Sequence, residues 1–347
     1  MIACMRRLAW GSLLIALPMH GSGLRSPWDG TQVAVTRAAY ACPAVQALPR
    51  DLVMDPYYSD AQYSVVDPVK KAAYEIAAAV PEQFGRQVTE AADAYRKRGS
   101  VEAAQCVAAM LAAAAAEHAF TGKMSSRQAN YAQSWLLGGV AMAWLKVRED
   151  KPVSATEEQE ISTWLGTMAR QVEAFYDACA ADHESDAHNN LAYWEGMSVA
   201  AAGIAANDDA LFAWGVARYR DGIAQITPEG TLPLEMARGV RSLHYHLFAA
   251  APLVMLAEMG EANHLDLYAE KDGALHRLVE RAISGITQPE YFDHAAGVRQ
   301  ERIEPVQSAD IGWAVPYARR FPSPAIHDAL GRVSDKAYWQ WGGLPPP

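Results

Sequence analysis

The feature that most constrains this chain is an apolar pattern of helical period that continues almost without interruption from Val69 towards the C-terminus. Large apolar residues recur at spacings of three and four across 135–145, which places them on one face of a helix. Residues 103–120 are rich in alanine, the strongest helix former. No convincing run of alternating β-branched residues competes with this pattern. The sequence therefore predicts an all-α fold.

Gly, Pro, Asn and Asp clusters divide the pattern into separate helices. Pairs of helices in series, at roughly 30–50 residues per pair, favour a toroid or a solenoid of helical hairpins. No strict repeat is present, which argues against a true repeat array, and other helical bundles remain possible on pattern alone. Helices are predicted from Val69 to just before Pro81 and at 103–120, 135–145, 155–179, 189–205, 208–226, 237–259, 265–285 and 308–319.

The first residues have the pattern of an export signal. Arg6 and Arg7 precede an apolar stretch from Leu8 to Pro18, and small and polar residues follow. We assign residues 1–25 to a signal peptide, 26–62 to a leader and N-terminal arm, and 63–347 to one large domain. No later stretch is long and apolar enough to span a bilayer. We therefore expect a periplasmic or secreted protein that does not remain in the membrane.

The net charge limits the classes of partner that this chain can bind, and its cysteines limit the disulfides that it can form. The formal net charge of −10 argues against nucleic acid, whose binding depends on clustered Lys and Arg, although a local positive groove on an acidic protein still suits an acidic polymer. Cys4 falls within the signal, so Cys42, Cys106 and Cys179 remain in an oxidising compartment. At most one pair of these three forms within the chain, and their spacing does not choose it.

Asn189 and Asn190 form the first of two informative segments. They follow His188 and precede an apolar stretch that contains Tyr193 and Trp194. One reading is an N-cap, which needs a single Asn. The other is a pair of carboxamides that bind a ligand beside aromatic rings, although aromatic residues at helical spacing more often belong to the core.

The second segment carries Arg238, Arg241 and Tyr245. Arg238 and Tyr245 are seven residues apart, about two helical turns, which predicts that they share one helix face. His244 and His246 flank the tyrosine at a spacing that is poor for a metal pair on a helix, where i and i+4 is usable. A basic pair at a helix start is often a solvated surface, but positive charge there is mildly unfavourable, which favours a specific partner.

Together the two segments supply a plausible set of groups for β-elimination on a uronic acid. An amide and a guanidinium neutralise the C5 carboxylate, and a phenol moves the protons. The chain has no Gly-rich phosphate loop, Cys-x-x-Cys pair or Gly-x-Ser-x-Gly elbow, and we expect no cofactor and no metal. Paired carboxylates of a hydrolase remain an alternative, because Asp and Glu are plentiful and their pairing is spatial.

With these segments in place, the chain resembles the alginate lyases, the poly(β-D-mannuronate) lyases of polysaccharide lyase family five. Each shared motif is weak alone, but their order and spacing behind an export signal are fairly specific. The motifs are Cys42-Pro43-Ala44-Val45, Thr121-Gly122-Lys123, Ser134-Trp135-Leu136-Leu137-Gly138-Gly139, Asn189-Asn190-x-x-Tyr193-Trp194, Leu232-Pro233-Leu234-Glu235 with Arg238, Leu243-x-Tyr245-His246 and Trp313-x-x-Pro316-Tyr317.

The resemblance implies an incomplete α/α toroid with a deep groove and metal-free eliminative cleavage of an acidic polysaccharide by a monomer. It assigns catalysis to Tyr245 as base and acid, with Asn190 and Arg238 neutralising the substrate carboxylate. It also implies a disulfide between Cys42 and Cys106, leaving Cys179 free. The further substrate-binding residues that we expect are Trp135, Tyr193, Asn189, Arg241, His188, His244 and Lys71, the last (or its neighbour Lys70) on a mobile lid.

One position departs from the family pattern. The family has His directly after the Asn pair, and this chain has Leu191. His188 or His244 can take over from a neighbouring position. Three readings follow: retained activity, a shifted substrate, or a lyase-like protein that binds a uronan without cutting it.

The protonation chemistry favours a changed preference over a complete loss of activity. A phenol with a pKa of about 10 is a poor base at pH 7, and we expect a neighbouring arginine to lower the pKa of Tyr245. One phenol can serve both proton steps when the C5 proton and the C4 oxygen lie on the same face, as in β-D-mannuronate. Guluronate places them on opposite faces and needs a second base.

Overall fold

The computed structural model describes residues 23–31, 33–44, 46–60 and 65–347, so the predicted signal peptide lies almost entirely outside the described residues. Within them the chain is helical, and isolated β-bridges occur in place of strands. The predicted all-α fold is confirmed. None of the described helices is long and apolar enough to cross a membrane.

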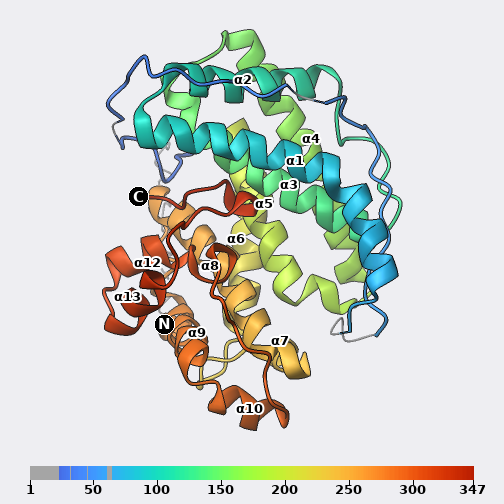
Figure 1. Cartoon of the computed structure of the whole chain (residues 1–347), viewed down its shortest axis with the longest axis vertical. Coiled ribbons are helices and arrows are strands. Elements are labelled where there is room, and N and C mark those ends of the chain that lie inside the picture. Colours follow the sequence, from blue (N-terminus) through green and yellow to red (C-terminus); the bar gives the residue numbers. More distant parts are fainter. Residues whose placement is uncertain (1–22, 32, 45, 61–64) are drawn as a thin grey trace, which may run out of the picture.

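Helical hairpins in two layers build the domain (Figure 1). The inner helices contact one another in sequence, and so do the outer helices, which gives an incomplete α/α toroid. The inner layer contains α1 (Pro68–Arg98), α3 (Arg127–Val147), α5 (Asn190–Ala206) and α8 (Ser242–Ala262). The outer layer contains α2 (Val101–Ala116), α4 (Ala155–Ala181), α6 (Asp209–Ala224) and α9 (Glu270–Thr287).

Shorter helices complete the C-terminal half and join the hairpins. They are α7 (Pro233–Met236), α10 (Glu290–Ala296), α11 (Ser308–Ile311), α12 (Ala314–Arg320) and α13 (Pro324–Gly331), with 3₁₀ turns at η1 (Arg148–Asp150), η2 (Ser185–Ala187), η3 (Gly239–Arg241) and η4 (Trp339–Trp341).

Helix α5 is the centre of the packing. It contacts α3, α4, α6 and α8, and almost all of its side chains are buried, which explains why its sequence is apolar on every face. Its contact with α6 is close because Gly196 faces Gly215, where a β-carbon on Gly215 would collide with the Gly196 carbonyl oxygen. This packing fixes the N-terminal end of α5, which carries Asn190.

The N-terminal arm is fastened to the outer layer. A disulfide joins Cys42 of the arm to Cys106 of α2, with the two Cα atoms 5.5 Å apart, while Cys179 is free and buried. The predicted disulfide is therefore confirmed. Trp28, in the segment that we expected to be a leader, is also buried against the domain.

Three helix predictions differ from the structure. Helix α1 continues through Pro81 to Arg98, because a proline removes only one backbone donor and this one is buried in a long, well-packed helix. The helix predicted at 237–259 begins only at Ser242, after the turn η3. The helix predicted at 308–319 is interrupted between α11 and α12, around Gly312.

Candidate functional site

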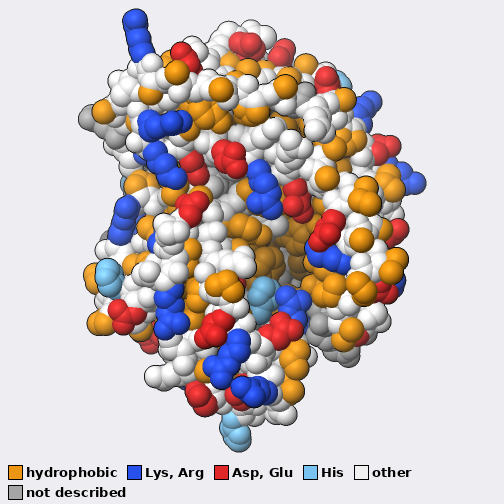
Figure 2. Space-filling model, viewed as in Figure 1, with side chains coloured by type: hydrophobic (Ala, Val, Ile, Leu, Met, Phe, Trp, Pro, Cys, Tyr) orange, Lys and Arg blue, Asp and Glu red, His pale blue; other side chains and the backbone are white. Residues whose placement is uncertain are grey.

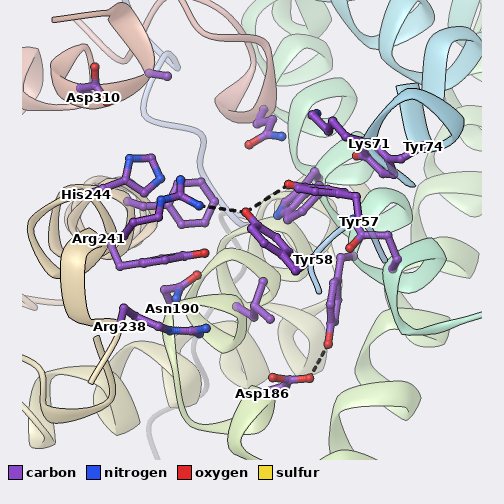
Figure 3. A pocket seen from close by; sticks show the side chains of 18 of the residues that line it. Tyr57, Tyr58, Lys71, Tyr74, Asp186, Asn190, Arg238, Arg241, His244 and Asp310 are labelled. Carbon is purple, nitrogen blue, oxygen red and sulfur yellow. Dashed lines mark hydrogen bonds between the residues drawn. The ribbon is translucent and has the colours of Figure 1, made fainter. Parts of the chain in front are cut away.

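A cavity of about 290 Å³ opens beside the inner layer, between the arm and α1 on one side and α5 and α8 on the other. Figure 2 shows the hollow near the centre of this face, with apolar side chains inside and charged side chains around it. Among the predicted site residues, the following line the cavity: Lys71, Trp135, Asn190, Arg238, Arg241, His244 and Tyr245. Figure 3 shows Lys71 on one side of the cavity and Asn190, Arg238, Arg241 and His244 on the other.

The two adjacent asparagines have different roles, because one caps helix α5 and the other lines the cavity. Asn189 is the N-cap of α5, and its side-chain oxygen accepts a hydrogen bond from the Leu191 backbone N–H at 2.9 Å. Asn190, the first residue of the helix, lines the cavity instead. Both readings of this segment are therefore present, the cap on Asn189 and the cavity-facing amide on Asn190.

Glu235 is fully buried and is hydrogen-bonded to Asn190. One carboxylate oxygen accepts the Asn190 backbone N–H at 2.7 Å, and the other accepts the Asn190 Nδ2–H at 2.8 Å. The second oxygen also lies 3.6 Å from Arg238 Nε. Burial raises the pKa of Glu235, while the Arg238 charge and the Asn190 hydrogen bonds oppose that rise.

Arg238 and Tyr245 do not share a helix face, contrary to the prediction from their spacing. Arg238 lies in the turn before η3, which begins at Gly239 with a φ of +60°, and Tyr245 lies in the first turn of α8. The turn nevertheless brings them together, because the Arg238 guanidinium carbon lies 4.6 Å from the centroid of the Tyr245 ring. Arg241 lies 5.2 Å from the same ring.

Two tyrosines that we did not predict form the opposite wall. Tyr57 and Tyr58 come from the N-terminal arm, and Figure 3 shows them facing the arginines across the cavity. Arg241 Nη1 donates a hydrogen bond to the Tyr58 hydroxyl at 3.0 Å, and Tyr58 is also hydrogen-bonded to Tyr245. The adjacent tyrosines in an aperiodic segment were the only sequence signal.

Tyr245 does not have the protonation behaviour that we expected, and its neighbour Tyr58 has a pKa shifted in the opposite direction. Burial raises the pKa of Tyr245, and the neighbouring Tyr58 raises it further, so the opposing effect of Arg241 and Arg238 is outweighed. The expected lowering of the Tyr245 pKa is therefore wrong. Burial also raises the pKa of Tyr58, but its hydrogen bond with Tyr57 and the charge of Arg241 bring that pKa below the ordinary value.

Comparison with known proteins identifies the family of this chain. The sequence profile of the alginate lyase family matches residues 51–292. The chain belongs to the alginate lyase family. A polysaccharide lyase of Stenotrophomonas maltophilia (strain K279a) is 37% identical over 302 residues, covering 86% of this chain and 88% of that protein. An alginate lyase of Azotobacter vinelandii is 30% identical over 345 residues, covering 96% and 91%.

Solved structures support the fold of this polysaccharide lyase. Alginate lyase A1-III from Sphingomonas species A1 superposes with a TM-score of 0.74 at 24% identity, covering 88% of this chain and 86% of that one. A histidine-to-alanine variant of A1-III complexed with a tetrasaccharide gives a TM-score of 0.76 at 24% identity, covering 88% and 83%.

Three further predicted site residues of the lyase line the cavity with polar or aromatic side chains. Trp135 lines the cavity, and its buried indole N–H has no hydrogen-bond partner among the described residues. Lys71 Nζ lies 4.6 Å from the centroid of the Tyr57 ring and 3.4 Å from Glu75. Burial and the charge of Arg241 lower the pKa of His244 to about 4, which makes its imidazole neutral near pH 7.

Three predicted substrate-binding residues lie outside the cavity lining. The Asn189 side chain caps α5, as described above. Tyr193 is buried, and its hydroxyl donates to the His188 carbonyl oxygen at 3.3 Å. His188 is exposed at the surface. Leu191, which occupies the position of the family histidine, does line the cavity. Among the described residues no cluster of His, Cys, Asp and Glu has the arrangement of a metal site.

Proposed function

We propose that this lyase cleaves a uronic-acid-containing polymer by β-elimination, with an alginate-like polymannuronate or another acidic exopolysaccharide as substrate. The observation that carries the proposal is the meeting of Arg238, Arg241 and the Asn190 amide around one phenol, Tyr245. Cations and an amide suit a carboxylate, and a phenol beside them is placed to move the C5 proton.

The first step removes the C5 proton. Arg238 and Asn190 hold the C5 carboxylate, so that charge developing on it in the enolate is stabilised. The cluster starts with Tyr58, whose pKa is lowered, as the phenolate, its proton having passed to solvent. Tyr245 then passes its own proton to the Tyr58 oxygen along their hydrogen bond and takes the C5 proton.

The second step breaks the bond between C4 and the glycosidic oxygen. The electron pair of the former C5–H bond forms the C4–C5 double bond, and the departing oxygen takes the proton from Tyr245. Tyr58 then returns its proton to Tyr245, which restores the cluster. Because Tyr245 serves both steps, the geometry favours a substrate with the C5 proton and C4 oxygen on one face, as in β-D-mannuronate.

Leu191 supports a substrate that differs from plain alginate. An aliphatic side chain lines the cavity where the family has an imidazole, so this wall offers an apolar surface. Such a surface suits a sugar that bears a deoxy or acetyl group. We also propose that the lyase is periplasmic or secreted, a proposal supported by the signal-like first residues and the disulfide.

Substitution of Tyr245 by Phe tests the proposal, because it removes only the hydroxyl. We expect eliminative turnover to fall by roughly 100-fold or more, the usual contribution of a positioned acid–base group. Tyr219→Phe is the matched control, since this buried hydroxyl donates to the Leu267 carbonyl away from the cavity. Turnover is measured as ultraviolet absorbance of the new double bond. If Tyr245→Phe keeps more than about a tenth of the wild-type rate, the assignment of the base is wrong.

A further inference from the structure

Among the residues that the structure describes, Glu235 is the one fully buried carboxylate that touches two of the proposed substrate-binding groups at once. Its two oxygens accept both N–H groups that Asn190 directs at it, and Arg238 lies beside one of them. The two groups come from different elements, Asn190 from the start of α5 and Arg238 from the turn after α7. Glu235 is therefore the shared contact that sets the distance between them.

We propose that Glu235 is a positioning residue that holds Asn190 and Arg238 as one unit and fixes the orientation of the Asn190 amide. This inference rests on the proposed function for its substrate, but the orientation itself does not. A carboxylate accepts hydrogen bonds and has none to donate, so the amide must turn Nδ2 towards Glu235. Oδ1 is then turned away from Glu235.

The free amide oxygen agrees with this orientation. Asn190 Oδ1 is buried and has no hydrogen-bond partner among the described residues, although Asn190 lines the cavity. A buried acceptor without a partner is costly unless a ligand supplies a donor. In this proposal a hydroxyl of the bound sugar supplies that donor, while the second N–H of Nδ2 remains for the carboxylate.

The charge of Glu235 also limits the attraction that Arg238 exerts. With the carboxylate 3.6 Å from its Nε, Arg238 is partly neutralised before substrate arrives. Ground-state binding of an anionic sugar is thereby weakened, whereas the geometry of the amide and guanidinium is preserved for the transition state. Loss of this carboxylate thus has opposite effects on substrate binding and turnover.

Glu235→Gln separates positioning from a purely structural role. Gln accepts the Asn190 backbone N–H with its oxygen and turns its own N–H₂ towards the Asn190 side chain, which forces that amide to reverse. We expect kcat to fall about 10-fold or more, since misplaced groups cost up to about 100-fold, while KM stays equal or falls. In the Asn190→Ala background the part of the effect that acts through Asn190 is lost, so the same change should lower kcat by a clearly smaller factor than in wild type, and the remainder acts through Arg238.

Glu258→Gln is the matched control. Glu258 is also buried and bound to an arginine, with its oxygen 2.7 Å from Arg320 Nε, and it does not line the cavity. We expect that variant to lose stability and keep its kcat and KM. Glu235→Gln with a kcat within about twofold of wild type, or with effects that multiply fully with Asn190→Ala, overturns the proposal.

Neutron crystallography of the unliganded wild-type enzyme determines the orientation of the Asn190 side-chain amide directly and does not depend on the folding of a variant. Deuterium on the Asn190 atom that faces Glu235 is the expected result, and an oxygen in that place overturns the inference. Failure of the wild-type enzyme to cleave any uronan contradicts the proposed function alone, because the amide orientation is still determined by this measurement.

Discussion

His246 should make the stability of the lyase depend on pH in the mildly acidic range. The imidazole is fully buried in α8. Nε2 accepts the Leu232 backbone N–H at 2.9 Å, so the ring proton lies on Nδ1 and is donated to the Ser242 carbonyl oxygen at 2.7 Å. This neutral tautomer anchors the residue before α7, the helix that carries Glu235.

The size of the effect follows from the shift of the pKa. Burial lowers the pKa of His246 from 6.5 to about 4, against the opposing effect of the Ser242 carbonyl. The unfolded chain therefore binds a proton below pH 6.5 that the folded protein takes up only near pH 4, and stability falls across that window as the pH falls. Between pH 7 and pH 5 the loss from this group is about 2 kcal/mol.

Urea unfolding of wild type and His246→Gln at both pH values measures this contribution. The glutamine carbonyl replaces Nε2 as the acceptor for Leu232 without titrating, so its variant should lose about 2 kcal/mol less than wild type between pH 7 and pH 5. His244, whose pKa is also lowered to about 4, titrates in both proteins and cancels from the comparison. Equal losses in the two proteins refute the reasoning.

Three further outcomes are expected. Arg238→Ala should lower both turnover and affinity for a uronate oligosaccharide, since the guanidinium binds the ground-state carboxylate as well as the enolate; unchanged affinity by calorimetry counts against that role. Leu191→His should raise activity on plain polymannuronate by a charged hydrogen bond worth roughly 1–3 kcal/mol and lower it on the native polymer; no gain would show that the surrounding groove has diverged too. Replacing Cys42 and Cys106 by Ala opens a loop with a sequence separation of 64, which should cost about 4 kcal/mol in denaturant unfolding, whereas Cys179→Ala should not produce that loss.

The helical architecture was largely predictable because it depends on periodicity. Where an apolar face recurs every three or four residues, as across α3, the helix is evident from the sequence. Helix boundaries that depend on tertiary packing were not predictable in this way. Pro81 should end a helix by local rules, yet packing around it carries α1 onward. The turn at Gly239 likewise depends on a left-handed backbone that the pattern did not indicate.

The site was predictable only where its residues lie in recognisable motifs. Asn190, Arg238 and Tyr245 belong to two such segments and do meet in the cavity. Tyr58 escaped notice because its segment has no period and is brought to the cavity by the disulfide and bridges of the arm. Glu235 belongs to the motif Leu232-Pro233-Leu234-Glu235, but its partner Asn190 lies 45 residues away, so its role appears only in three dimensions.

The central claim, eliminative cleavage of a uronan at this cavity, is tested most directly by a screen of acidic polysaccharides. Purified wild-type enzyme is mixed with polymannuronate, polyguluronate, polyglucuronate and acetylated or deoxy-sugar exopolysaccharides, and ultraviolet absorbance and reducing ends are followed together. The account predicts that both rise in step on at least one polymer whose C5 proton and C4 oxygen lie on the same face, and that Tyr245→Phe abolishes the signal. Reducing ends that rise without the absorbance would show hydrolysis and contradict it.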